Sequence, residues 1–133
     1  MSGFENIYYA YDWSNLYRFN VRLLEWVLSI LKLEKKVVQA SGLNVKGKSM
    51  RLIIDIVKAV GGKVYLSGFG GAKYQDEKLF KEEGIELRYY EFSHPVYPQL
   101  WSDFIPNLSI IDLLFNCGPE SLNIILRGKE GSK

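Results

Sequence analysis

A glycine-rich turn supplies the first group of residues that could do chemistry. The segment Ser67-Gly-Phe-Gly-Gly-Ala-Lys-Tyr74 follows an apolar stretch and precedes a helical pattern. The backbone N–H groups of such a strand-to-helix turn suit anions and polar substrate groups. The dinucleotide fingerprint G-x-G-x-x-G fails, because Lys73 stands at its third glycine position. Two interpretations stay open: a tight turn in which glycines supply positive φ, or a substrate-binding turn formed by Gly68, Gly70, Gly71, Lys73 and Tyr74.

A proline-bounded loop holds the only histidine of the chain. The segment Phe92-Ser-His94-Pro-Val-Tyr97-Pro-Gln99 comes directly after a strand pattern. In a parallel sheet the ligand crevice lies at the carboxyl ends of the strands, so we expect His94, Tyr97 and Gln99 to line one crevice with the glycine-rich turn. Histidine suits proton transfer near neutral pH, which makes His94 the candidate catalytic base. The alternative is a stiff loop whose polar side chains only satisfy backbone groups.

Asp112 and Asn116 lie four residues apart in Ser109–Cys117, an otherwise apolar helical pattern, and share one helix face. A buried aspartate is costly unless it is paired. Asp112 is therefore a candidate catalytic residue and Asn116 a candidate substrate ligand. The alternative is structural, because Ser109-x-x-Asp112 resembles a capping box. Cys117 has no basic neighbour in the sequence, which is typical of a core thiol.

The stretch Gly42-Leu-Asn-Val-Lys-Gly-Lys48-Ser49 matches the P-loop pattern G-x-x-x-x-G-K-[ST] and lies between a predicted strand and a predicted helix. A nucleotide-binding protein is therefore one alternative. The preceding strand pattern is short, however, and no later strand ends in an aspartate that could contact the metal of a bound nucleotide. A polar entry into a helix explains the stretch as well.

Composition excludes several classes of function. Seventeen Lys and Arg against fifteen Asp and Glu give a net charge of +2, too little for binding a phosphate backbone, so we expect no nucleic-acid partner. With one cysteine and one histidine, neither a disulfide nor a metal site is expected, and no cofactor. The amino terminus lacks the features of a signal peptide, and no apolar tract is long enough to span a membrane. These features predict a cytoplasmic protein.

Alternating patterns predict the α/β class. Strands are expected at 37–40, 63–67 and 85–92, and helices at about 15–33, 50–60, 75–83 and 109–117. Short connections between them favour parallel strands with right-handed crossovers. We therefore predict a small three-layer domain over residues 1–127, with a parallel sheet of about three strands and flanking helices. A polar tail follows at 128–133.

Three ordered blocks of the sequence resemble the carboxy-terminal part of the WbqC-like protein family. They are Lys63–Asp76, which contains Y-L-S-G, Gly84–Gln99, which contains F-x-H-P-x-Y-x-Q, and Leu108–Gly118, which contains L-S-I-I-D-L-L-F-N-x-G. The His-Gln-Pro motif in the amino-terminal half of full-length members is absent. The resemblance therefore implies that this half is missing from a fragment or lies on another polypeptide.

The resemblance implies a role in biosynthesis of a surface polysaccharide of the O-antigen type. The expected reaction is transfer of an acyl or aminoacyl group to an amino sugar, with a sugar or sugar nucleotide as the small-molecule substrate. His94 would take a proton, the glycine-rich turn would hold an anionic donor, and Asp112 and Asn116 would orient the loop or sugar hydroxyls. Two alternatives remain: a non-catalytic module that docks onto a partner carrying the amino-terminal half, and the P-loop nucleotide-binding protein.

Overall fold

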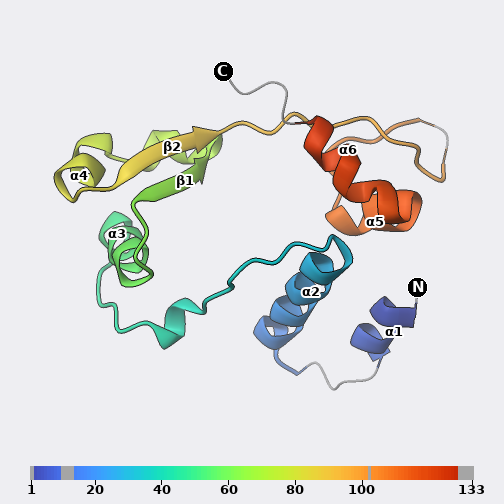
Figure 1. Cartoon of the computed structure of the whole chain (residues 1–133), viewed down its shortest axis with the longest axis horizontal. Coiled ribbons are helices and arrows are strands. Elements are labelled where there is room, and N and C mark those ends of the chain that lie inside the picture. The colour runs from blue at the N-terminus through green and yellow to red at the C-terminus, as the bar shows by residue number, and fades with distance from the viewer. Residues whose placement is uncertain (1, 10–13, 102, 129–133) are drawn as a thin grey trace. The chain divides into compact units, whose positions relative to one another are not determined.

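A computed structural model describes residues 2–9, 14–101 and 103–128, which fall into two compact units (Figure 1). Val37–Phe92 form one unit. The described residues up to Lys36, together with those from Ser93 onward, form the other. The single domain expected over residues 1–127 stays a prediction, and of the polar tail only Gly128 lies within the described residues.

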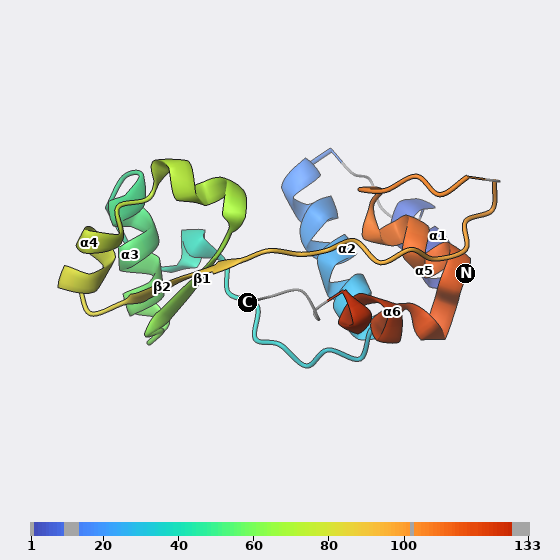
Figure 2. The same ribbon diagram turned by 90° about the horizontal axis from the view of Figure 1, so that it is seen from above.

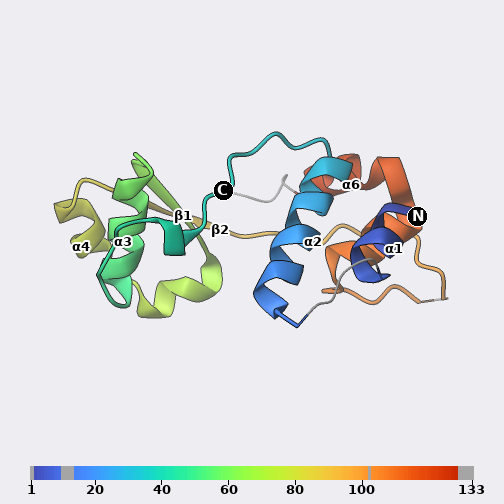
Figure 3. The ribbon, with the colours of Figure 1, turned by 90° about the horizontal axis from the view of Figure 1, so that it is seen from below.

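The Val37–Phe92 unit is built around two parallel strands, which confirms the α/β class. Strand β1 (Val64–Gly68) pairs with β2 (Glu86–Tyr90) over their full length, with Val64 opposite Glu86 and Gly68 opposite Tyr90. The segment between them holds the 3₁₀ helix η2 (Phe69–Tyr74) and helix α4 (Glu77–Glu82), and helix α3 (Met50–Ala59) precedes β1. Figures 2 and 3 show the paired strands in two further views.

A small apolar core holds α3 and α4 against one face of the two strands. Ile54, Val57, Phe80 and Ile85 are buried, and the ring of Tyr65 stacks on that of Phe80 at 5.6 Å. Burying each such side chain contributes about 1.5–3 kcal/mol. Beyond the core, the Glu83 carboxylate accepts hydrogen bonds from Arg51 and Lys58 of α3. Those two hydrogen bonds lower the pKa of Glu83 below its usual range, and the one from Lys58 has the larger effect.

Local signals fix where these helices begin and end. The Asp76 side chain caps α4 by accepting from the backbone N–H groups of Lys78 and Leu79. After α3 the chain turns at Gly61, with φ +71°, and after α4 at Gly84, with φ +74°. Glycine favours this left-handed conformation, because it has no Cβ atom to clash with the backbone.

Two details of the predicted sheet are wrong. Val37–Ala40 is not a strand, and the 3₁₀ helix η1 (Ala40–Gly42) begins at its end. The carbonyls of Gln39 and Ala40 accept from Gly42 and Leu43, so local turn bonds use groups that a strand would offer to a sheet. The sheet of the described residues therefore has two strands. Within this unit α3 and α4 pack against the two strands through the apolar core.

The other unit is helical. It contains α1 (Ser2–Tyr9), α2 (Leu16–Ile30), α5 (Ile110–Cys117), the 3₁₀ helix η3 (Gly118–Glu120) and α6 (Ser121–Arg127). Its buried residues include Leu31, Leu113 and Leu114, while the ring of Phe4 packs on Trp26 at 5.6 Å and on Phe115 at 5.4 Å. Within the part of the chain that the structure describes, no helix has the length and apolar character needed to cross a bilayer.

Candidate functional site

The Asp112 carboxylate on α5 is the centre of a polar cluster. Its Oδ2 atom accepts hydrogen bonds from the Tyr97 hydroxyl at 2.8 Å and from Gln99 Nε2 at 3.1 Å. Its Oδ1 atom accepts from Asn116 Nδ2 at 3.1 Å, and the same amide nitrogen reaches the Asp112 backbone carbonyl at 2.8 Å. All four side chains are half-buried. We call Tyr97, Gln99, Asp112 and Asn116 the Asp112 cluster; three donors offset the cost of burying its charge.

The start of α5 agrees with one half of the capping-box alternative. The Ser109 hydroxyl caps the helix by accepting from the Ile111 N–H at 3.3 Å. The Asp112 side chain, which a capping box would turn back to the helix start, instead contacts the loop residues Tyr97 and Gln99. Asp112 therefore ties the loop to α5.

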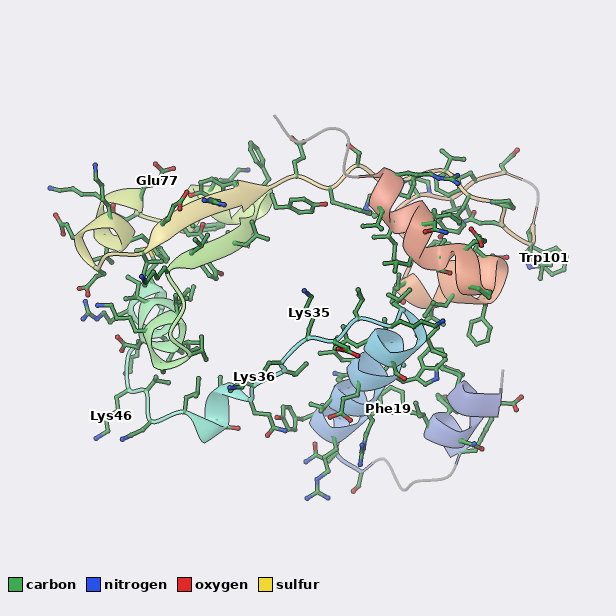
Figure 4. All side chains as sticks on the ribbon, viewed as in Figure 1. Phe19, Lys35, Lys36, Lys46, Glu77 and Trp101 are labelled. Carbon is green, nitrogen blue, oxygen red and sulfur yellow. The ribbon has the colours of Figure 1, made fainter. Side chains whose placement is uncertain are left out.

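Gln99 closes this loop through its side-chain amide. Its Oε1 atom accepts from the Ile105 N–H at 2.8 Å, and its Nε2 atom donates to the Ile105 carbonyl at 3.0 Å. The ring of Phe104 packs edge-on against that of Tyr97 at 5.3 Å. Trp101 lies on the closed part of the loop and is 81% exposed (Figure 4). The amide acts as a clasp between Gln99 and Ile105, and nothing in the sequence periodicity indicated the part played by Ile105.

Burial sets the protonation of two groups beside Asp112. It raises the pKa of Tyr97, and the hydrogen bond to the Asp112 carboxylate adds to the shift. Burial likewise raises the pKa of the Cys117 thiol, with a smaller contribution from the charge of Asp112. Tyr97 therefore stays a hydroxyl donor at neutral pH. Cys117 stays a thiol, which agrees with the interpretation as a core residue and not a nucleophile.

His94 lies three residues before Tyr97, in the same unit, and its side chain is exposed. The Asp112 cluster and the Gln99 clasp hold the loop that directly follows it. An exposed imidazole on a loop anchored in this way can meet a substrate from solvent.

The glycine-rich turn folds as η2, and its three glycines differ in how much space a side chain would have. A Cβ atom at Gly71 would lie 2.6 Å from Ser67 Oγ and 2.9 Å from Gln75 Nε2, two atoms that are hydrogen-bonded to each other. A Cβ atom at Gly68 or Gly70 would meet nothing within 4 Å. None of the three has positive φ, so the tight-turn explanation given above does not apply. Sequence reasoning also missed the pair Ser67–Gln75, because its partners belong to different predicted elements.

The predicted site residues divide between the two units. Gly68, Gly70, Gly71 and the exposed Lys73 and Tyr74 belong to the Val37–Phe92 unit. The structure brings Tyr97, Gln99, Asp112 and Asn116 together in the other unit, which also contains His94. A crevice common to both groups stays a prediction. Among residues 2–9, 14–101 and 103–128, no three potential metal ligands gather at one place.

The P-loop pattern does not fold as a phosphate cradle. The strand that should precede it is absent from the described residues, and η1 stands at its first glycine. A Cβ atom at Gly47 would lie 2.7 Å from both the Leu52 backbone nitrogen and Asp55 Oδ2. The segment therefore lies against the first turns of α3, where a P-loop would hold phosphate. The nearby carboxylate of Asp55 would repel a phosphate group.

Comparison with known proteins identifies the family of the chain. The model of the WbqC-like protein family matches residues 1–124. The chain belongs to the WbqC-like protein family. The uncharacterized protein Rv1507c of Mycobacterium tuberculosis (strain ATCC 25618 / H37Rv) is 29% identical over 116 residues. That alignment covers 86% of this chain and 50% of Rv1507c, so the chain spans about half the length of this relative. No solved structure matches the WbqC-like chain significantly.

Proposed function

We propose that this WbqC-like chain takes part in the biosynthesis of a surface polysaccharide, by transfer of an acyl or aminoacyl group to an amino sugar. The observation that carries the proposal is the Asp112 cluster. It anchors the loop that follows the exposed His94 through two hydrogen bonds to one carboxylate, donated by Tyr97 and Gln99. A fixed loop supports general base catalysis, which needs the base within hydrogen-bond reach of the proton that it removes.

The proposed step uses an activated acyl donor, such as a thioester or ester, and an amino sugar. The amino nitrogen attacks the carbonyl carbon, a C–N bond forms, and the His94 imidazole takes the proton that the nitrogen loses. The bond from the carbonyl carbon to the leaving group then breaks. The leaving group departs with the electron pair of that bond and receives the proton from the imidazolium. The reaction needs no oxidant or reductant.

Two features support a role for the glycine-rich turn in holding the anionic donor. Gly68 and Gly70 have neither positive φ nor a steric reason to be glycine within the described residues. Glycine at such positions permits close approach of a ligand to the backbone. Lys73 is exposed in the same turn and provides a positive charge for a phosphate or carboxylate.

The test is the variant His94→Ala, made in cells that carry this chain together with the family's amino-terminal half. We expect the modified sugar to disappear from the surface polysaccharide, as measured by mass spectrometry, because loss of a general base slows a reaction roughly 10²–10⁴-fold. The stability of the purified variant should stay within about 1 kcal/mol of the original, since His94 is exposed.

The matched control is Lys35→Ala, at another exposed residue of the same unit (Figure 4). It should leave the polysaccharide unchanged. Full modification in the His94→Ala cells, or an unfolded His94→Ala protein, would return His94 to a structural role and refute the proposed chemistry.

A further inference from the structure

One face of the two-stranded sheet is uncovered and partly apolar. Tyr65 and Leu87 pack against the core of α3 and α4, so the alternate residues of β1 point the other way. Of these, Leu66 is 61% exposed and Val64 42%. Parallel sheets are ordinarily covered on both faces, whereas these two residues of the Val37–Phe92 unit are largely exposed.

The two strands differ on this face. Glu86 and Arg88 of β2, which stand opposite Val64 and Leu66, form an exposed ion pair at 2.6 Å. Charged side chains are a common protection of an edge strand against pairing with another chain. The sequence of β1, Val-Tyr-Leu-Ser-Gly, contains no charged residue. On this comparison β2 is suited to be the edge of a sheet and β1 is suited to be an inner strand.

The backbone of β1 agrees with that difference. Within the described residues β1 pairs with β2 alone, so its other edge offers N–H and C=O groups to a further strand. Two strands alone make a marginal sheet.

We propose that the free edge and the apolar face of β1 are the docking site for a β-strand of a second polypeptide, one that corresponds to the half of the family relative that this chain does not span. Three observations point to this occupant: the uncharged edge, the exposed pair Val64 and Leu66, and a relative of which the chain covers 50%. The added strand would present apolar residues at alternate positions and leave the charged β2 at the edge. This inference does not rest on the transferase chemistry.

The experiment mixes the whole chain with a separately produced polypeptide, the half of Rv1507c that this chain does not match. We expect a one-to-one complex by light scattering. Amide hydrogen exchange at residues 64–68 should slow by about tenfold or more in the complex, because backbone pairing protects the amides of an edge strand. Leu66→Lys, at a position exposed in the isolated chain, should weaken the complex by at least about tenfold, since it puts a charge into an apolar contact.

Val60→Lys is the matched control, because Val60 is another exposed aliphatic residue of the same unit and lies outside the sheet. It should leave the complex intact, and circular dichroism should show both variants folded. The proposal is overturned if no complex forms, or if the complex forms without protecting β1 or without responding to Leu66→Lys. Protection of β1 already present in the isolated chain would also overturn it. A second copy would then be the occupant if that protection rises with concentration, and Val37–Ala40 of the same chain if it does not.

Discussion

At the scale of single residues, Asp112 is the most informative position of the helical unit. Both of its carboxylate oxygens accept hydrogen bonds from within the protein: Oδ2 from Tyr97 and Gln99, and Oδ1 from Asn116. A carboxylate with three internal donors is poorly available to a substrate. The geometry therefore favours a positioning role for Asp112 over direct proton transfer. In this role Asp112 fixes the loop that follows His94 in the sequence.

Tyr97→Phe tests whether the cluster holds the loop. The change removes one hydroxyl and leaves the half-buried Asp112 with one donor fewer. We expect a loss of roughly 1.5–3 kcal/mol in the free energy of unfolding, the range for hydrogen bonds to charged groups. Urea denaturation measures it. Tyr74→Phe, at a tyrosine that is 80% exposed, should change stability by less than about 0.5 kcal/mol. Equal stabilities for the two variants would show that the hydrogen bond from Tyr97 to Asp112 does not stabilise the fold.

At the scale of elements, the glycine-rich turn allows the effect of a Gly→Ala substitution on stability to be compared at two neighbouring positions. In Gly71→Ala the new methyl group would lie within 3 Å of Ser67 Oγ and of Gln75 Nε2, and Ser67 is buried. We expect a loss of about 1–3 kcal/mol, as for overpacking of a tight site. Gly70→Ala places its methyl group in open space and should be neutral or stabilise by up to about 1 kcal/mol. Chemical denaturation measures the free energy of unfolding of both variants. A Gly71→Ala protein as stable as Gly70→Ala would contradict the structure.

Elements determined by local sequence were predictable, and elements determined by distant contacts were not. The helices at Leu16–Ile30, Met50–Ala59 and Ile110–Cys117 follow from apolar spacing, and so do both observed strands. Val37–Ala40 has the composition of a strand but no neighbour to pair with among the described residues. The grouping of Asp112 with Asn116 followed from helix spacing, whereas the clasp between Gln99 and Ile105 depends on how the loop closes in three dimensions.

At the scale of the whole molecule, the family model matches nearly the full chain. The relative Rv1507c is about twice as long as the region that matches it. The family alone does not distinguish an enzyme from a docking module. The structure contributes observations to both: an anchored loop behind His94 in one unit and an uncharged strand edge in the other. The uncharged edge is the basis of the proposed docking of a second polypeptide, which the experiment on β1 tests directly.

The nucleotide-binding alternative makes its own prediction for the whole chain. A P-loop holds phosphate on free N–H groups between a strand and a helix, with a lysine over the phosphates. Here no strand precedes the pattern within the described residues, and Gly47 lies against Leu52 and Asp55 of α3. Calorimetric titration with MgATP should therefore show no micromolar binding, and Lys48→Ala should give the same result as the original chain and as the control Lys46→Ala. Micromolar binding that disappears only in Lys48→Ala would restore the NTPase interpretation, because it would require this segment to leave α3 and form the cradle.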